Sequence, residues 1–496
     1  MTASVLAGGD FNLKRGLEMA GMLEGLQPEK VFYYFEAISK IPRGSTYEKK
    51  VSDYLYEWAK GKNFEVTRDE ALNILIKKPG TPGYENAPMV ILQGHMDMVW
   101  EKNQDTVHDF FNDPIKLRVV GDYIYASGTT LGGDNGIGVA CAQAILDSSD
   151  IPHPPLEVLI TTDEENGLTG MEKFNAKKLT GRILINVDNE EEGIFTSGCA
   201  GGGRIYFHIP ERRVAPKYQQ FYKLGIKGLK GGHSGNDIDK ERGNSIKLLG
   251  RILFDLKDNI DIAELGGGAK ANAIPRESWA LVSVKDGFGI EETVREWNKT
   301  LQYELAFSDA AIQVTIDKYD GSRDVYDENI KKTIIHLITI IPNGPLVRDL
   351  EHNLVIYSNN LGVMSMKDDK ITFECCPRSS VKSLFRQLLG ICEQIADILH
   401  IQFEANSFYP SWEYTKESQI RELFVKTYED LYGVKGTVNV IHAGLECGFL
   451  VERIPGIDAV SIGPNMYDLH TPNEHVSISS VGKTFKLLCE VLKRLQ

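Results

Sequence analysis

The sequence lacks a long apolar run and a secretory signal. A bilayer-spanning helix needs about 20 apolar residues, whereas the most hydrophobic short segment, residues 334–341, contains His336 and Thr339 and stops at Pro342. The N-terminal MTASVLAGGDFNLKR has no basic start followed by an apolar stretch, as a signal peptide would. These absences argue against a membrane partner and predict a cytoplasmic protein.

Cysteine pairs and positive charge are also scarce. The seven cysteines are an odd number without a C-x-x-C pair, which argues against a disulfide framework and a structural zinc finger and fits a reducing compartment. Lys and Arg number 55 against 69 Asp and Glu, for a net charge of −14, which disfavours nucleic acid as a partner. The 42% hydrophobic and 25% charged residues are typical of a globular protein. A chain of 496 residues predicts two domains.

The first half of the chain alternates between helical and strand patterns. Short apolar runs typical of buried strands lie at residues 73–76, 89–93, 156–161 and 182–187, and residues 137–146 have a helical composition. Strands separated by helices predict an α/β domain with a mostly parallel sheet flanked by helices. Ligands gather at the carboxyl ends of such strands.

A second, inserted domain is expected after a glycine-rich run at residues 197–203, which we interpret as a hinge. Residues 203–406 contain several strand patterns and long amphipathic helices, and the last ninety or so residues resume the alternation of the first half. The sequence therefore predicts a discontinuous catalytic domain, 1–202 and 407–496, interrupted by an α+β domain at 203–406.

Five stretches place acidic or histidine side chains beside turn-forming residues. They contain His95 and Asp97, Asp134, Glu164 and Glu165, Asp188, and His470. Imidazole and carboxylate are the ligands that divalent cations prefer in hydrolytic centres. Any one stretch is more often a solvated turn, but five in order, several of them ending apolar runs, argue against coincidence.

The charge of this set predicts a pair of metal ions. Asp134, Glu165 and Asp188 carry three negative charges, and a bridging hydroxide would add a fourth, so two divalent cations would neutralise the cluster. His95 and Asp97 are two residues apart and would project to the same side of an extended segment. Of the adjacent Glu164 and Glu165, one is expected to bind metal and the other to transfer protons.

The ordered set GHMDMV, LGGDNGIG, TTDEENG, NVDNE, GGHSG and HTPNEHVSI resembles the M20 metallopeptidase family. Within that family, ECCPRSS and HAGLECG resemble the aminoacyl-histidine dipeptidases, and the resemblance covers the chain from about residue 25 to its end. It implies an inserted lid that often mediates homodimerisation. It also implies a dinuclear metal-dependent dipeptidase that hydrolyses short unblocked peptides, including Xaa-His and β-alanyl-histidine.

The resemblance implies a role for each motif residue. Asp134 would bridge two metal ions, zinc or alternatively manganese or cobalt, and precede a cis peptide bond to Asn135. Glu164 would be the general base, Asp97 would orient a ligand, and His233 in GGHSG would stabilise the oxyanion. The implied metal ligands are His95, Asp134, Glu165, Asp188 and His470.

The resemblance also implies that Asn272 and Arg378 in the lid hold the substrate, with Arg378 gripping a C-terminal carboxylate. Glu446 and His442 in HAGLECG, outside the lid, are expected to line the substrate pocket. Without the resemblance, His233 would be interpreted as a loop histidine and Arg378 as part of a surface ion pair. Tyr409 is interpreted as a packing residue. One rival function is another M20 amide hydrolase, a tripeptidase or a deacylase, which would share every metal ligand. A non-catalytic metal-binding protein is the second rival, which would not need Glu164 or His233.

Overall fold

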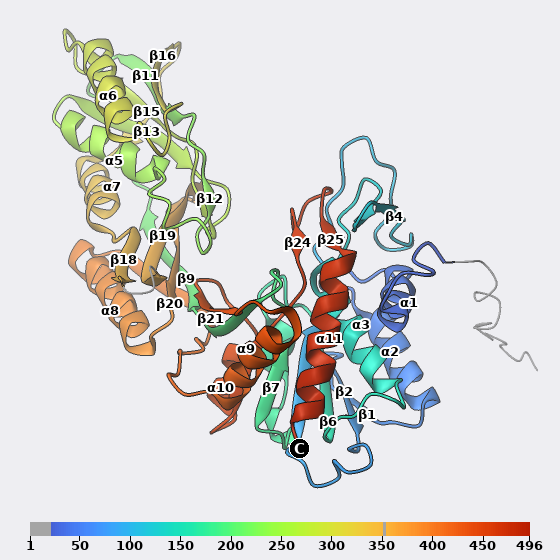
Figure 1. The fold of residues 1–496 in the computed structure, drawn as a ribbon. Helices are drawn as coiled ribbons and strands as arrows, with labels where there is room; N and C mark the ends of the chain where they lie inside the picture. The colour runs from blue at the N-terminus through green and yellow to red at the C-terminus, as the bar shows by residue number, and fades with distance from the viewer. Residues whose placement is uncertain (1–20, 351–353) are drawn as a thin grey trace, which may run out of the picture. The chain divides into compact units, whose positions relative to one another are not determined.

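The structure is a computed structural model that describes residues 21–350 and 354–496. The chain forms two compact units (Figure 1). Unit 1 contains the described residues up to Phe195 together with Ser418–Val438 and Gly456–Gln496, and unit 2 contains Thr196–Glu417 and Asn439–Pro455.

Unit 1 contains most of an eight-stranded sheet in the order β1-β2-β6-β3-β7-β23-β8-β22, whose strands β8 and β22 also include residues of unit 2. Its strands are β1 (Glu65–Arg68), β2 (Ile74–Lys78), β3 (Val90–His95), β6 (Leu156–Thr161), β7 (Ile183–Asn186), β8 (Ile194–Cys199), β22 (Thr437–Ile441) and β23 (Asp458–Ser461). β3 is parallel to both β6 and β7, and β23 is parallel to β7, whereas β1 and β2 are antiparallel. The predicted mostly parallel sheet is confirmed in this central part.

One large apolar core joins this sheet to its helices. Alternate residues of the buried strands, such as Val90 and Leu92 of β3, point into the core. The main helices of unit 1 are α1 (Glu29–Ser39), α2 (Lys49–Gly61), α3 (Gly133–Leu146), α9 (Gln419–Tyr432) and α11 (Ile478–Arg494). α3 approaches the sheet closely, because a Cβ atom on Gly138 would overlap the Val187 carbonyl oxygen. This approach brings the start of α3 beside the end of β7.

A smaller sheet in unit 1 has the strand order β24-β25-β5-β4. Its strands are β4 (Leu117–Val120), β5 (Tyr123–Ala126), β24 (Met466–Tyr467) and β25 (His475–Ser477). His470 lies in the loop between β24 and β25, so this sheet determines its position. Two short helices, α4 (Thr169–Lys173) and the 3₁₀ helix η1 (Ala176–Lys178), connect β6 to β7.

Unit 2 contains a nine-stranded sheet in the order β16-β11-β15-β13-β19-β20-β9-β21, with β18 paired to β19. The strands are β9 (Gly201–Pro210), β11 (Gln220–Lys227), β13 (Ile260–Gly267), β15 (Ser278–Val284), β16 (Gln313–Tyr319), β18 (Gly344–Asp349), β19 (Leu354–Lys367), β20 (Lys370–Ser379) and β21 (Gln402–Tyr409). Every recorded pairing in it is antiparallel.

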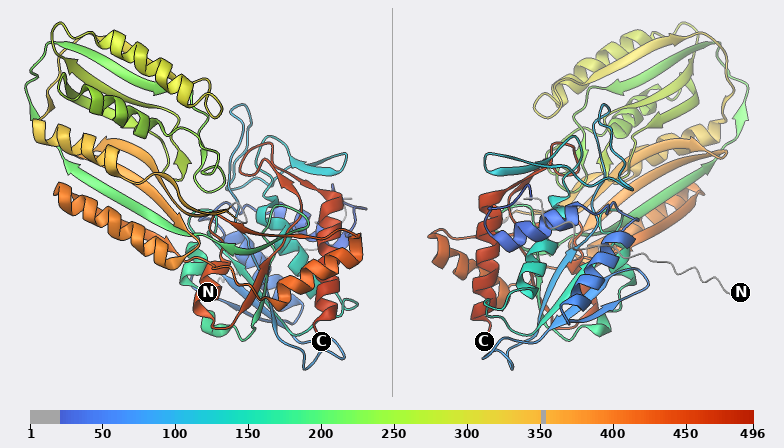
Figure 2. Two further views of the ribbon diagram at one scale, coloured as in Figure 1. Left: turned by 60° about the vertical axis from the view of Figure 1, so that its left-hand side comes forward. Right: turned by 90° about the vertical axis from the view of Figure 1, so that its right-hand side faces the viewer.

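Four long helices cover one face of this sheet (Figure 2) and share a second apolar core with it. They are α5 (Ser245–Leu256), α6 (Ile290–Glu304), α7 (Glu328–Ile340) and α8 (Lys382–Leu399). Two short ribbons, β10 (Arg213–Val214) with β17 (Val325–Tyr326) and β12 (Gly232–His233) with β14 (Ala273–Ile274), and the helix α10 (Cys447–Arg453) complete the unit. The expected mixture of strands and amphipathic helices is therefore present.

Unit 2 is larger than the insertion expected over residues 203–406. It begins at Thr196 and also contains residues 407–417 and Asn439–Pro455. The glycine-rich run that we interpreted as a hinge lies within β8 and β9 instead of a loop. Its glycines allow close contact, since a Cβ atom on Gly202 would overlap the Tyr409 ring. The hinge role of this run stays a prediction, since the boundary between the units lies directly before it, at Phe195 and Thr196.

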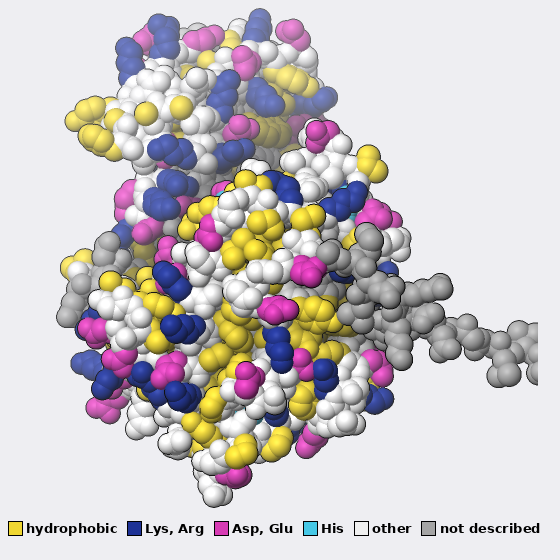
Figure 3. All heavy atoms as spheres, turned by 45° about the vertical axis from the view of Figure 1, so that its right-hand side comes forward, with side chains coloured by type: hydrophobic (Ala, Val, Ile, Leu, Met, Phe, Trp, Pro, Cys, Tyr) yellow, Lys and Arg dark blue, Asp and Glu magenta, His cyan; other side chains and the backbone are white. Residues whose placement is uncertain are grey.

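The charged side chains on the surface and the free cysteine thiols agree with what the amino-acid composition predicts. On the face that Figure 3 shows, Lys and Arg side chains are interspersed with Asp and Glu. All seven cysteines are free thiols. Among the described residues, no helix is long and apolar enough to cross a membrane.

Candidate active site

The acidic and histidine motifs meet at one edge of the unit 1 sheet. His95 is the last residue of β3, Glu164 and Glu165 follow β6, and Asp188 follows β7. Because β6, β3 and β7 are adjacent and parallel, their carboxyl ends lie together. The α3 start and the β24–β25 loop bring Asp134 and His470 to the same place.

Asp134 is common to two groups of potential metal ligands, His95–Asp134–Asp188 and Asp134–Glu165–His470. His95 Nε2 lies 3.1 Å from Asp134 Oδ1 and 3.4 Å from Asp188 Oδ1. His470 Nε2 lies 3.5 Å from Asp134 Oδ2 and 3.0 Å from Glu165 Oε2. Each group combines imidazole with carboxylate, as hydrolytic metals require. Since Asp134 offers one oxygen to each group, the donor set fits two divalent ions that share this carboxylate.

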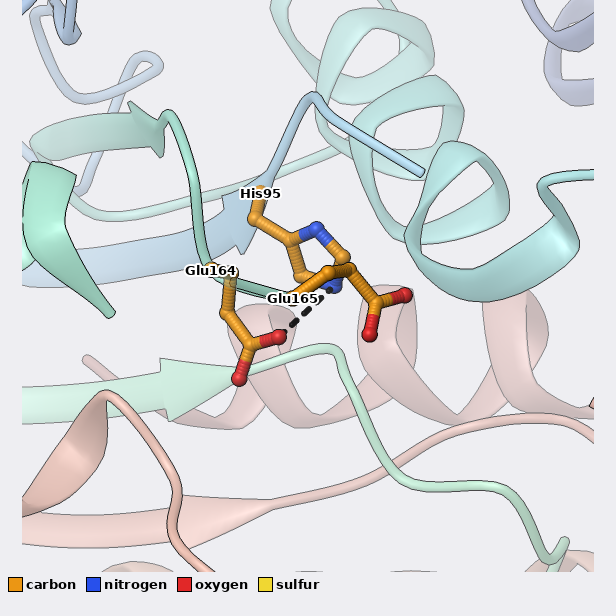
Figure 4. A group of neighbouring side chains, drawn as sticks. All are labelled: His95, Glu164 and Glu165. Atoms are coloured by element: carbon orange, nitrogen blue, oxygen red, sulfur yellow. Dashed lines mark ion pairs between the residues drawn. The ribbon is translucent and has the colours of Figure 1, made fainter. Parts of the chain in front are cut away.

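Glu164 and Glu165 both lie beside the Nε2 end of the His95 ring (Figure 4), with Glu164 Oε2 4.0 Å from Nε2. Together with His95 they form a third group of potential ligands. Adjacent residues can both lie beside this ring because the chain has already left β6. Their separate roles, base for Glu164 and ligand for Glu165, stay predictions.

The pKa values reflect a surplus of negative charge. Burial lowers the pKa of His95, but the Asp188 and Asp134 carboxylates raise it well above its usual value. Burial also lowers the pKa of His470, but the Asp134 and Glu165 carboxylates outweigh this effect and raise the pKa to about 11. Burial raises the pKa of Asp188 to about 6. Without metal ions, this cluster therefore retains protons.

Asp97 links the histidine to both glutamates. Its Oδ1 lies 3.3 Å from His95 Nδ1, and its two carboxylate oxygens accept hydrogen bonds from the Glu164 N–H (3.1 Å) and the Glu165 N–H (3.3 Å). The Ser45 hydroxyl donates a further hydrogen bond of 2.9 Å. This arrangement can orient the His95 ring and hold the loop that carries both glutamates.

Arg43 is a buried residue that sequence reasoning missed. The residue is 2% exposed, and its guanidinium donates hydrogen bonds of 3.0 Å to the carbonyls of Met96 and Asp97 and another to the Gly132 carbonyl. It therefore ties the segment after β3 to the loop before Asp134. Since these partners are backbone atoms distant in the chain, no motif around Arg43 indicated this contact.

Glu474 binds the backbone N–H groups of the same loop before Asp134. Its carboxylate accepts hydrogen bonds of 2.8, 3.1 and 2.8 Å from the backbone of residues 131–133. The peptide bond between Asp134 and Asn135 is cis, as the family resemblance implied. Glu474 lies within HTPNEHVSI, and the motif by itself assigns it no role.

A second cluster lies within unit 2 around Arg378, which is 5% exposed. The guanidinium donates to the Tyr409 hydroxyl (3.0 Å) and the Ser234 hydroxyl (3.4 Å), and its Nη2 atom lies 3.4 Å from His233 Nε2. Among the described residues, Arg378 forms no ion pair. A surface salt bridge, the simpler interpretation of Arg378, is therefore wrong, and Tyr409 contributes more than packing.

His442 and Asn272 belong to the same unit. His442 Nε2 lies 2.7 Å from the Ser358 hydroxyl, and burial, together with Arg378 and His233, lowers its pKa to about 3. The Asn272 carbonyl accepts a hydrogen bond of 2.8 Å from the Ser234 N–H. A cavity of 900 Å³ is lined by residues that include His233 and Asn272. Glu446 is completely buried at the start of α10.

Comparisons with known proteins agree with this geometry. Residues 91–494 match Peptidase family M20/M25/M40. The chain belongs to this family. A cytosol non-specific dipeptidase of Escherichia coli (strain K12) is 38% identical to this M20 chain over 479 residues, which are 95% of the chain and 99% of that protein.

Solved structures give the same result for the fold of the M20 chain. The aminoacylhistidine dipeptidase from Vibrio alginolyticus has a TM-score of 0.85 at 38% identity, covering 96% of this chain and 98% of that one. A tripeptidase from Staphylococcus aureus has a TM-score of 0.54 at 17% identity, with 95% and 99% covered, so it supports only the fold. The predicted family, fold class and peptidase activity are confirmed.

Proposed function

We propose that this M20 peptidase is a dinuclear metal-dependent dipeptidase that hydrolyses short unblocked peptides, including Xaa-His and β-alanyl-histidine. The observation that carries the proposal is the shared position of Asp134 in two ligand groups. The activities named for the relatives from E. coli and V. alginolyticus support a dipeptide substrate.

Five residues would hold the two ions, which we propose to be zinc, with manganese or cobalt as alternatives: His95, Asp134, Glu165, Asp188 and His470. When bound, such ions act as Lewis acids and make water a nucleophile near neutral pH. Glu164 would take a proton from the attacking water and deliver it to the leaving amine. Asp97 would keep His95 and the Glu164 loop in place for this transfer.

Unit 2 would supply the substrate contacts. Arg378 is a buried cation surrounded by neutral donors and acceptors, which fits a bidentate grip on the free C-terminal carboxylate of a dipeptide. His233 would donate a hydrogen bond to the oxyanion that forms at the scissile carbonyl. Asn272, His442 and Glu446 would line the remainder of the pocket.

The proposal extends to the cellular location and the oligomeric state of the protein. We propose a cytoplasmic location, supported by the free thiols and by the name of the E. coli relative. We also propose a homodimer through the inserted unit, which light scattering after size-exclusion chromatography would test. A monomer at micromolar concentration would contradict the dimer without affecting the proposed reaction.

The test is a substrate panel with purified protein, chelated and then supplied with zinc, manganese or cobalt. Dipeptides, including β-alanyl-histidine, are expected to be hydrolysed only after metal is restored. Tripeptides and acetylated amino acids distinguish the rival M20 functions. Faster hydrolysis of acetylated amino acids than of any dipeptide would indicate a deacylase, and activity that survives complete chelation would contradict the metal-dependent reaction.

A further inference from the structure

The strand β19 contains three consecutive polar residues, Ser358, Asn359 and Asn360, whose side chains alternate between the two faces of the sheet. All three are buried, with exposed fractions of 1%, 0% and 1%. Successive side chains in a strand point to opposite faces, so Ser358 and Asn360 share a face and Asn359 points the other way. Their hydrogen bonds follow this alternation, because only the first and third contact segments that carry predicted substrate-binding residues.

Ser358 contacts the HAGLECG segment. Its hydroxyl oxygen lies 2.7 Å from His442 Nε2, a short hydrogen bond that fixes the direction of the imidazole ring. In the β19–β20 pairing, Ser358 is directly opposite Arg378. Side chains of directly opposed residues lie on the same face of a sheet. Ser358 therefore connects the His442 ring to the face that presents the Arg378 guanidinium.

Asn360 contacts the segment that carries Asn272. Its side-chain amide donates hydrogen bonds of 2.7 Å to the Ala271 carbonyl and 2.8 Å to the Ala273 carbonyl. One amide thus holds the backbone on both sides of Asn272. The contact is close, because a Cβ atom on Gly362 would lie 2.5 Å from the Ala271 carbonyl oxygen.

The segment held by Asn360 is paired with the strand that carries His233. Ala273 is paired with His233 in the short β12–β14 ribbon, and the Ser234 N–H donates to the Asn272 carbonyl. A displacement of residues 271–273 would therefore also displace His233. The two polar side chains on one face of β19 together hold the segments bearing Asn272 and His442, the first of which is paired with the strand that carries His233.

We propose that Ser358 and Asn360 are positioning residues for substrate recognition, acting through His442 and through the Asn272 segment. This inference rests on the proposed function of unit 2. Neither residue needs to contact the substrate. Their loss is expected to weaken dipeptide binding and transition-state contacts in unit 2, while the metal ligands in unit 1 keep their ions.

Asn359 provides a matched control. It is the neighbouring asparagine, is equally buried, and donates a 2.8 Å hydrogen bond to the Pro342 carbonyl. In both asparagines the Oδ1 atom has no hydrogen-bond partner among the described residues. Asn359→Ala and Asn360→Ala therefore make the same chemical change on opposite faces of one strand, and a general loss of stability would affect both.

The experiment measures kcat and KM for a free dipeptide, metal content and melting temperature for wild type, Asn359→Ala, Asn360→Ala and Ser358→Ala. Asn360→Ala is expected to lower kcat/KM by about 10-fold or more, mainly through KM, since 1.4 kcal/mol corresponds to a factor of 10. Ser358→Ala should act in the same direction. Asn359→Ala should keep the wild-type KM, and all variants should retain two metal ions.

Equal KM values for the two asparagine variants would overturn the inference. If Asn360→Ala does not fold, Asn360→Ser, which keeps one donor, takes its place with Asn359→Ser as its control. The proposed function fails separately, if the wild type hydrolyses no dipeptide or if Arg378→Ala leaves KM unchanged. A normal Arg378 effect beside indistinguishable Asn359 and Asn360 variants would reject only the positioning role.

Discussion

The cluster around Asp134 in unit 1 has a surplus of negative charge, whereas the cluster around Arg378 in unit 2 has a surplus of positive charge. In unit 1, four carboxylates meet two histidines whose pKa values are raised. In unit 2, the buried Arg378 is surrounded by hydroxyl and imidazole groups. A buried charge without an opposite charge is costly. This difference fits the proposed roles, in which the first cluster binds cations and the second binds the carboxylate of a substrate.

The two clusters also differ in how they are supported. In unit 1, Arg43 and Glu474 hold backbone carbonyl and N–H groups around Asp134. In unit 2, the support comes from side chains on one face of β19. Changes in the first support should therefore affect metal binding, and changes in the second should affect substrate binding.

The largest expected effect separates the two glutamates beside His95. Glu164→Ala should lower kcat by about 10²–10⁴, as loss of a proton-transfer group does, while both ions stay bound. Glu165→Ala should instead lose one ion. Metal content measured by mass spectrometry, together with kcat, checks this difference, and metal loss in Glu164→Ala alone would mean that the roles are exchanged.

His233→Ala tests the oxyanion contact in unit 2. Removing one such donor typically lowers kcat by about 10²–10³, and the metal content should stay unchanged. If His233 acts on the site of another subunit, mixing His233→Ala with Glu164→Ala subunits should restore some activity, because a hybrid dimer would contain one site with both residues. No recovery despite subunit exchange would argue that His233 acts within its own chain or not at all.

The proposed partner of Arg378, the C-terminal carboxylate of the substrate, can be removed by changing the peptide instead of the protein. Amidating the C-terminus of a dipeptide should cost about 1.5–3 kcal/mol of binding, the range for hydrogen bonds to charged groups. Arg378→Ala should reduce the difference between free and amidated peptides, which competition kinetics would measure. Equal turnover of both peptides by the wild type would contradict the carboxylate grip.

Arg43→Lys tests the support of the metal cluster. Lysine keeps the charge, but a single ammonium group cannot reproduce the planar fork that joins three carbonyls. We expect a loss of about 10–100-fold in metal affinity, as for other residues that orient ligands, with little change in the preference for a free C-terminus. Calorimetric metal titration measures it, and unchanged affinity would limit Arg43 to a role in stability.

The smallest effect is the release of protons when metal binds. The pKa of His470 is about 11 without metal, so its imidazole is protonated at neutral pH and the ion must displace that proton. Metal affinity should therefore rise with pH and fall as pH is lowered. Calorimetry in buffers of different ionisation enthalpy counts the protons, and no buffer dependence would contradict the raised pKa.

The sequence by itself determined the metal-ligand candidates and much of unit 1. Its motifs follow buried strands, and the carboxyl ends of adjacent parallel strands converge, so His95, Glu165 and Asp188 could be predicted to meet. The predicted runs at 89–93, 156–161 and 182–187 correspond to β3, β6 and β7. Local apolar patterns suffice for such elements because burial determines them.

Only the tertiary structure decided which residues support these sites. Arg43 contacts Gly132, 89 positions away, and Asn360 contacts Ala271, also 89 positions away. The close contact between Gly202 and Tyr409 likewise depends on the pairing of β9 with β21. A hydrogen bond or close approach of this kind joins segments distant in the chain and leaves no periodic pattern in the sequence, so it emerges only when strand order and register are known.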